Sequence, residues 1–208
     1  MNKVNYQKIL DKEIEKITTS GEVPTLLLHS CCAPCSSYVI EYLSQYFKIT
    51  VFYYNPNISP ESEYMYRAKE QQRLINSMET KYKVNFLEGE YIPEEFYHTC
   101  KGLENAPEGG ERCIRCFDLR LKKTAQKAKE GDYDYFTTTL TISPLKNAQA
   151  INIIGRDISS VYGVKYLFSD FKKKEGYKRS IVLSEKYNLY RQNYCGCVFS
   201  KKQSNCEK

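Results

Sequence analysis

The sequence predicts an α/β protein with a mostly parallel sheet of about five strands. Short apolar or β-branched runs alternate along the chain with segments of helical spacing, which is the pattern of repeated βαβ units. Proline follows serine at 59–60 and at 143–144, a pair typical of helix starts. The chain of 208 residues is 41% hydrophobic, enough for one substantial core. We therefore expect a single domain over residues 1–208, with a helical lead-in at 1–22 and a cysteine-containing tail at 188–208.

The first half of the chain contains two predicted strands and two predicted helices. Residues 23–28 form a short apolar run, and helical spacing follows over 36–47. Residues 48–54 are β-branched and aromatic and are followed by Asn-Pro-Asn, so they predict a second strand that ends in a turn. A helix is expected to begin at Ser59-Pro60-Glu61 and to end near Met78, because serine caps, proline fits the first turn and glutamate complements the helix dipole.

The second half continues the alternation. The third, fourth and fifth strands are expected at 83–87, 135–139 and 164–168. Two helices are expected between them, and Ser143-Pro144 is expected to start the second one. Their apolar faces are formed by Ile114, Phe117, Leu121, Ala125 and Ala128, and by Ala148, Ile151, Gly155, Ile158 and Tyr162.

Two segments fit no regular pattern, residues 98–112 and 190–208, and both carry cysteines. Long loops that persist in a compact domain are usually functional. No apolar stretch approaches the roughly 18 residues of a membrane span, and no signal peptide is recognisable. We therefore expect a cytoplasmic protein without membrane contact.

The charge is compatible with a nucleic-acid partner. A net charge of +6 and 19 tyrosines suit a surface that contacts phosphates and stacks on bases, although ordinary solubility charge accounts for them as well. The basic run at 171–179, with Phe171 and Tyr177 interleaved, offers candidate phosphate contacts or is a solvated loop. The candidates are Lys172, Lys173, Lys174 and Arg179.

Nine cysteines in a chain without an export signal favour metal binding or redox chemistry over a disulfide framework. Cys31, Cys32 and Cys35 follow the first predicted strand, where ligands gather in open α/β sheets. The helix start behind them would stabilise thiolates through its dipole and free amides. Cys35 is open to two interpretations, a buried small hydrophobe or a ligand of a second iron.

Cys113 and Cys116 form a C-x-x-C pair at the start of a predicted helix. Such a pair ligates a cluster or a structural zinc ion that fastens a loop. Together with Cys31 and Cys32 it gives the four thiolates typical of one 4Fe-4S cluster. Zinc is disfavoured on the expectation that adjacent cysteine side chains point apart. His29 is expected to be a buried histidine that orients the metal ligands through hydrogen bonds without binding the metal itself.

Cys195-Gly196-Cys197 is the third group. One intervening glycine permits a small, strained disulfide of the redox-active kind, and the alternative is that both cysteines are further metal ligands. Cys100 and Cys206 stand apart from the three groups, and we expect both to be non-essential.

The chain resembles the QueH family of epoxyqueuosine reductases over nearly all of its length after about residue 23. Four separate motif regions carry the resemblance. They are His29-Ser30-Cys31-Cys32-Ala33-Pro34-Cys35; Gly102-Leu103-Glu104 with Pro107-Glu108-Gly109-Gly110-Glu111-Arg112-Cys113, Cys116-Phe117 and Leu119-Arg120-Leu121; Phe136-Thr137-Thr138-Thr139-Leu140 with Ser143-Pro144; and Tyr190-Arg191-Gln192 with Tyr194-Cys195-Gly196-Cys197.

The resemblance implies an oxidoreductase that needs no cobalamin and reduces epoxyqueuosine to queuosine at the wobble position of tRNA, the last step of queuosine synthesis. It also implies a Rossmann-like fold of the HUP and PP-loop kind with three layers, a 4Fe-4S cluster on the four thiolates just named, a redox-active disulfide between Cys195 and Cys197, and an external electron donor. In the family that the chain resembles, some members have aspartate at the position of Cys35 and an iron beside the cluster.

Epoxide removal needs two electrons and an acceptor for the charge that develops on oxygen, which a redox pair, an iron or a protein acid can supply. A second resemblance is to PP-loop enzymes that thiolate tRNA by hydrolysing a nucleotide. Those enzymes cradle pyrophosphate with a glycine-containing loop, and residues 30–34 here contain no glycine. A zinc-stabilised RNA-binding module is a third possibility, but it would give Cys195 and Cys197 no role.

Overall fold

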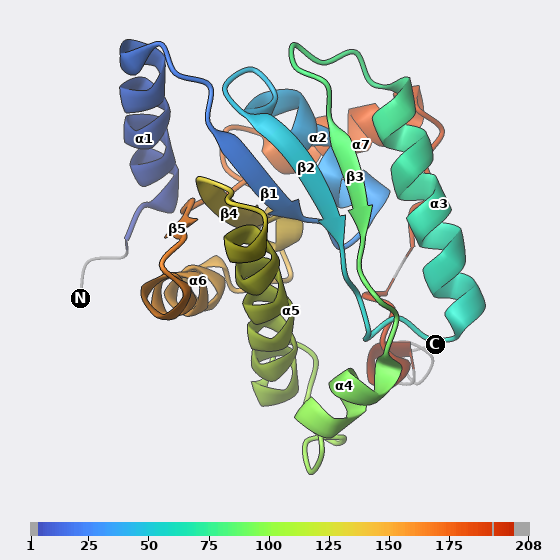
Figure 1. Ribbon diagram of the computed structural model, residues 1–208. Coiled ribbons are helices and arrows are strands. Elements are labelled where there is room, and N and C mark those ends of the chain that lie inside the picture. The colour runs from blue at the N-terminus through green and yellow to red at the C-terminus, as the bar shows by residue number, and fades with distance from the viewer. Residues whose placement is uncertain (1–3, 193, 202–208) are drawn as a thin grey trace.

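The computed structural model describes residues 4–192 and 194–201. Its centre is a five-stranded sheet in the order β3-β2-β1-β4-β5, and every neighbouring pair of strands is parallel (Figure 1). The strands are β1 (Thr25–His29), β2 (Lys48–Tyr53), β3 (Asn85–Glu88), β4 (Tyr135–Thr138) and β5 (Lys165–Tyr166). The predicted α/β class and parallel sheet are confirmed.

Helices cover both faces of the sheet and make three layers. They are α1 (Tyr6–Ser20), α2 (Ala33–Leu43), α3 (Glu61–Ser77), α4 (Pro93–Thr99), α5 (Glu111–Glu130), α6 (Ala148–Tyr162) and α7 (Gly176–Lys186), with a 3-10 turn η1 (Thr139–Ile142) after β4. The predicted helical lead-in corresponds to α1, which ends at Gly21 in the left-handed conformation.

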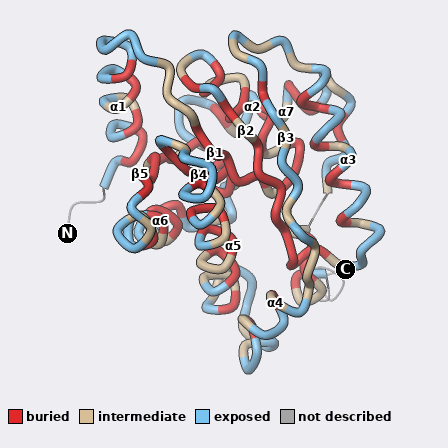
Figure 2. Tube along the Cα trace, viewed as in Figure 1, coloured by how far each residue is buried: buried red, intermediate tan, exposed pale blue. Residues whose placement is uncertain are grey.

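Side-chain alternation along the strands builds two cores. Leu26 and Leu28 of β1 pack with α1 and α2 on one face, and Leu27 packs with α5 and α6 on the other. Because both faces are covered, the inner strands are buried almost throughout, and Figure 2 shows them as the buried centre of the molecule. Edge strand β3 is largely exposed.

Several predicted boundaries were wrong. Helix α2 begins at Ala33, three residues before the predicted start at 36, because Pro34 fits the first turn of a helix. Ser143-Pro144 does not start a helix: Ser143 ends η1, and α6 is capped by Asn147, whose Oδ1 accepts a hydrogen bond from the Ala150 amide at 3.1 Å.

The irregular segment predicted at 98–112 is shorter than expected, because α4 extends to Thr99 and α5 begins at Glu111. Part of the basic run belongs to α7, which was not predicted. In the described part of the chain, no helix combines the length and apolar character that crossing a bilayer requires.

Candidate active site

The site lies at the carboxyl ends of β1 and β4. These neighbouring strands are followed by connections that lead to opposite faces of the sheet, and ligands bind at such switch points in open α/β folds. The loop after β1 carries Cys31, whose amide donates to Thr139 Oγ1 at 3.2 Å in the turn after β4. The two loops are therefore joined at the centre of the site.

Cys31, Cys32 and Cys35 form a compact group in which the three Sγ atoms all lie within 4.8 Å of one another. This cysteine triad has the geometry of a group that could hold a metal ion. Cys31 Sγ is 3.8 Å from Cys32 Sγ, so the expectation that adjacent side chains point apart was wrong. Side chains alternate only along a strand, and here β1 has ended at His29 while Cys32 already caps α2. Sulfur spacing therefore does not exclude zinc.

The triad concentrates negative charge on one sulfur. Hydrogen bonds from the thiols of Cys32 and Cys35, aided by the charges of Lys146 and Arg120, hold the pKa of Cys31 well below its usual range. The same hydrogen bond to Cys31 raises the pKa of Cys32 to about 11. Cys31 is thus the thiolate of the group.

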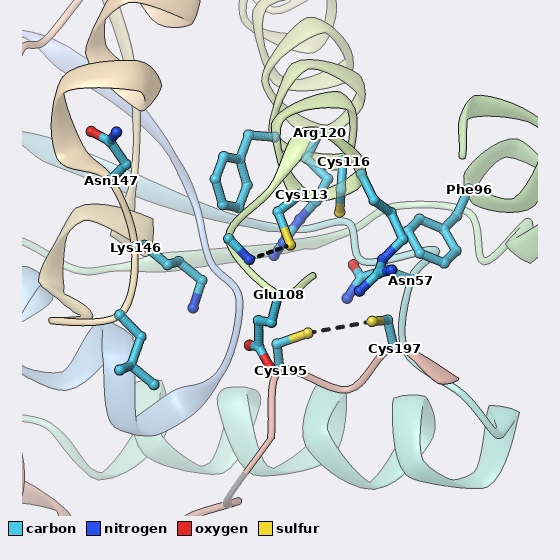
Figure 3. Close-up of a pocket in the computed structure, with 14 residues that line it drawn as sticks. Asn57, Phe96, Glu108, Cys113, Cys116, Arg120, Lys146, Asn147, Cys195 and Cys197 are labelled. Atoms are coloured by element: carbon cyan, nitrogen blue, oxygen red, sulfur yellow. Dashed lines mark hydrogen bonds between the residues drawn. The ribbon is translucent and has the colours of Figure 1, made fainter. Parts of the chain in front are cut away.

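Cys113 and Cys116 lie on the first turns of α5 and line a second cavity, separate from the triad. We call this the inner cavity, and the one lined by the triad the outer cavity. Both cavities are lined by Glu108, Arg120, Leu145, Lys146 and Cys195, so they adjoin one another. Figure 3 shows Lys146, Glu108, Cys113 and Cys195 around this shared region. Burial raises the pKa of Cys116 to about 11.

The Cys195-Gly196-Cys197 loop is fixed against α3. Buried Arg67 pairs with Glu63 at 2.7 Å and donates to the Cys195 carbonyl at 3.4 Å. Gly196 has φ 106°, and an added Cβ would lie 2.9 Å from Ile58 Cγ1. Only glycine satisfies both the backbone conformation and this close contact.

The two sulfurs of this loop lie 3.6 Å apart. The hydrogen bond between the two sulfurs, supported by the charge of Lys146, lowers the pKa of Cys195 to about 6. The same interaction raises the pKa of Cys197. At neutral pH the loop therefore presents one thiolate and one thiol, the form that enters thiol-disulfide exchange.

His29 is fully buried at the end of β1. Its Nδ1 is 2.8 Å from Thr138 Oγ1, and its Nε2 accepts from Arg120 Nε at 3.2 Å. Burial, reinforced by the charge of Arg120, lowers the pKa of His29 to about 3. The imidazole is thus neutral and positions Arg120, which lines both cavities.

Three cavity residues were not singled out from the sequence. Arg120 could have been identified from the sequence pattern, since it is a charged residue on the apolar face of α5 between Phe117 and Leu121. Glu108 lies in a motif of the family resemblance but was assigned no role, and Lys146 had no signal, because both lie in polar loops that only the fold brings to the cysteines.

The four basic candidates differ in their surroundings. Lys172 pairs with Asp170 at 2.6 Å, Lys174 with Asp11 at 2.7 Å and Arg179 with Glu41 at 2.7 Å. Lys173 is exposed and forms no ion pair within the described ranges. Phe171 is buried in the core and is not available for base stacking.

Of the two remaining cysteines, the structure describes one. Cys100 is buried beside Cys116 and Cys197 and does not line either cavity. Cys206 lies outside the described residues.

Comparison with known proteins identifies the family. The model of the family described as "Epoxyqueuosine reductase QueH" matches residues 26–203. A relative of that name from Staphylococcus epidermidis is 50% identical over 202 residues, covering 95% of this chain and 85% of the relative. Another from Streptococcus pyogenes is 47% identical and covers 99% of this chain and 81% of the relative.

A solved structure shares the fold. The U34-tRNA thiolase NcsA from Methanococcus maripaludis, solved with its [4Fe-4S] cluster, superposes with a TM-score of 0.53 at 13% identity, covering 98% of this chain and 77% of that one. This likeness supports the expected PP-loop-like layout, while the sequence matches decide the function. The chain belongs to the QueH family of epoxyqueuosine reductases, the oxidoreductases that convert epoxyqueuosine to queuosine in tRNA.

Proposed function

We propose that epoxide reduction takes place where the inner and outer cavities adjoin, with a 4Fe-4S cluster on Cys31, Cys32, Cys113 and Cys116 and a redox-active pair at Cys195 and Cys197. One observation carries this proposal. Five cysteines besides the redox pair line the two cavities, more than the four protein ligands of a structural zinc ion. The fifth, Cys35, is assigned to a second, mononuclear iron beside the cluster.

The donor set suits an iron-sulfur centre. Thiolates are the ligands that such clusters take, and Arg120 and Lys146 place two positive charges on the lining shared by both cavities. Those charges offset the negative charge of a thiolate-ligated centre. The cluster found in NcsA lies in a protein of the same fold, which supports placing one here, and no cobalamin is required.

The protein's own groups balance the reaction. When bound, the cluster supplies electrons one at a time. With Cys195 as thiolate and Cys197 as thiol, the pair releases two electrons and one proton as its disulfide forms. The epoxide takes up two electrons and two protons, loses its oxygen as water and becomes an alkene, so the second proton comes from another group. Lys146 points into the cavity (Figure 3); its pKa is raised because the negative charges of the neighbouring cysteine sulfurs, Cys31 foremost, outweigh its burial. It can therefore hold a proton for the departing oxygen. An external thiol or protein reductant then restores the dithiol.

Metal analysis of anaerobically purified protein tests the cofactor assignment. We expect about four iron and four sulfide per chain, with a surplus of about one iron for the site at Cys35. Zinc as the sole metal in a colourless, active enzyme would contradict the assignment, and the sulfur spacing makes zinc a real competitor.

We propose that tRNA docks across the mouth of the outer cavity with help from the basic run. A shallow cavity lined by Lys172 and Lys173 shares Pro144 and Lys146 with the outer cavity, so the phosphate backbone would lie next to the site. Lys172, Lys174 and Arg179 are largely neutralised by their ion pairs. Lys173 should therefore carry most of the contribution.

Charge reversal at Lys173 is expected to weaken tRNA binding and to reduce the slope of log affinity against log salt by about one. Lys174→Glu loses an ion pair and is expected to disturb the surface contact with α1 as well, so Lys173→Glu is the cleaner test. A triple reversal of Lys172, Lys173 and Lys174 that leaves the salt slope unchanged would place the tRNA contact elsewhere.

A further inference from the structure

Glu108 is the only carboxylate among the described residues that line the two cavities. The shared lining also contains the basic side chains of Arg120 and Lys146 and the sulfur of Cys195. A lone acid at such a place needs an explanation, because the negative charge is already supplied by thiolates.

The carboxylate is held toward the cavities. Ser200 Oγ donates to Glu108 Oε2 at 2.8 Å, and Glu108 forms no ion pair with any described residue. The turn beneath it is fixed by the Gly110 amide, which donates to the Pro107 carbonyl at 3.0 Å. In Figure 3 the carboxylate lies beside Cys195.

The position of Glu108 disfavours the thiolate form of Cys195 in the redox pair. The charge of Glu108 raises the pKa of Cys195, against the lowering effects of Cys197 and Lys146. A carboxylate that opposes the nearby thiolate and has no cationic partner among the described residues is suited to a ligand that brings a cation of its own.

The substrate has one such cation in the right place. Epoxyqueuosine consists of a 7-deazaguanine joined by an aminomethyl linker to a cyclopentane ring that carries the epoxide, and the secondary amine of that linker is protonated at neutral pH. The ammonium thus lies between the base and the reacting ring, as Glu108 lies between the outer and inner cavities.

The outer cavity also offers a partner for the base. Gln192 lines it, and its side-chain oxygen is buried without a hydrogen-bond partner in the described structure. The Watson–Crick edge of a deazaguanine has N–H donors that match this acceptor. Enzymes that act on a base take it out of the stack into such a pocket and read that edge.

We propose that Glu108 is a specificity-determining residue that binds the secondary ammonium of the substrate, with the deazaguanine in the outer cavity against Gln192 and the epoxide ring directed toward Cys195. This assignment rests on the proposed placement of the reaction where the cavities adjoin. It explains why an acid is retained beside a thiolate.

Equilibrium binding without reductant tests the assignment. The probes are one tRNA with three wobble bases: guanine, 7-aminomethyl-7-deazaguanine, which has the ammonium but no ring, and epoxyqueuosine. The wild-type holoenzyme is expected to bind both ammonium-bearing forms about tenfold more tightly than the guanine form, the scale of one charge-assisted hydrogen bond. Glu108→Gln is expected to abolish that preference and to leave the affinity for the guanine form unchanged.

Two controls separate recognition from folding. In Glu108→Gln the side-chain oxygen can still accept from Ser200. Glu111→Gln removes an exposed acid that pairs, among the described residues, with Arg115, so it is expected to keep the preference. An equal loss of affinity for all three tRNAs in Glu108→Gln, an unchanged preference, or no preference in the wild type would each overturn the proposal. Iron and sulfide measured on the same samples report separately on the cluster assignment.

Discussion

Replacing Cys31, Cys32, Cys113 or Cys116 with alanine is expected to remove the visible absorption of the iron-sulfur centre and the reductase activity together. Each sulfur would fill one corner of the cluster, with Cys113 and Cys116 coming from α5 and the other two from the segment after β1. We expect activity to fall by more than about 100-fold, since loss of residues that only support a metal ligand already costs 10- to 100-fold.

Cys100→Ala is the matched control for these four substitutions. Cys100 is a buried thiol beside Cys116 that does not line either cavity, so its loss is expected to lower stability while leaving iron and colour unchanged.

Cys35→Ala is expected to lose about one iron per chain and to keep the cluster spectrum. Full colour and full activity in Cys113→Ala would show that α5 holds no cluster ligand.

Replacing both Cys195 and Cys197 with serine is expected to leave iron content and absorption unchanged while abolishing multiple turnover. The pair lies at the cavity surface on a loop held by Arg67 and Gly196, so serine preserves its shape and removes its redox chemistry. Since the pKa of Cys195 is about 6, disulfide formation, in which the Cys195 thiolate is the nucleophile, should slow in the wild type as the pH falls below that value and Cys195 becomes protonated. Loss of about one iron per chain in the double variant would instead show that Cys195 and Cys197 are ligands of an iron, which contradicts the redox assignment.

Much of the fold was predictable because the strands are short apolar runs between turn residues. Helix α4 was missed because only Phe96 of its seven residues is buried, too few for a periodic signal. Helix α7 lies in a basic segment and buries Leu183 with small residues, so its apolar face is weak. The true cap of α6 was missed because Ser143-Pro144 has the same sequence signature as a helix start.

The cysteines of the site could be recognised from their spacing, but their environment could not. Arg120, Lys146 and Glu108 come from α5 and two loops far apart in the sequence, and only the sheet order brings them together. The 3.8 Å approach of Cys31 and Cys32 depends on where β1 ends and α2 begins, a boundary the sequence placed three residues too late. Small errors at element boundaries therefore reverse an argument about ligand geometry.

The most direct test of the account is a single turnover without external reductant, in which queuosine formed is compared with thiols lost. Enzyme with the cluster assembled and the dithiol reduced is mixed anaerobically with less than one equivalent of tRNA carrying epoxyqueuosine, and disulfides are mapped after quenching. The account predicts about one Cys195–Cys197 disulfide per queuosine, because one disulfide releases the two electrons that the epoxide consumes. Full conversion to queuosine with both thiols still free would contradict it.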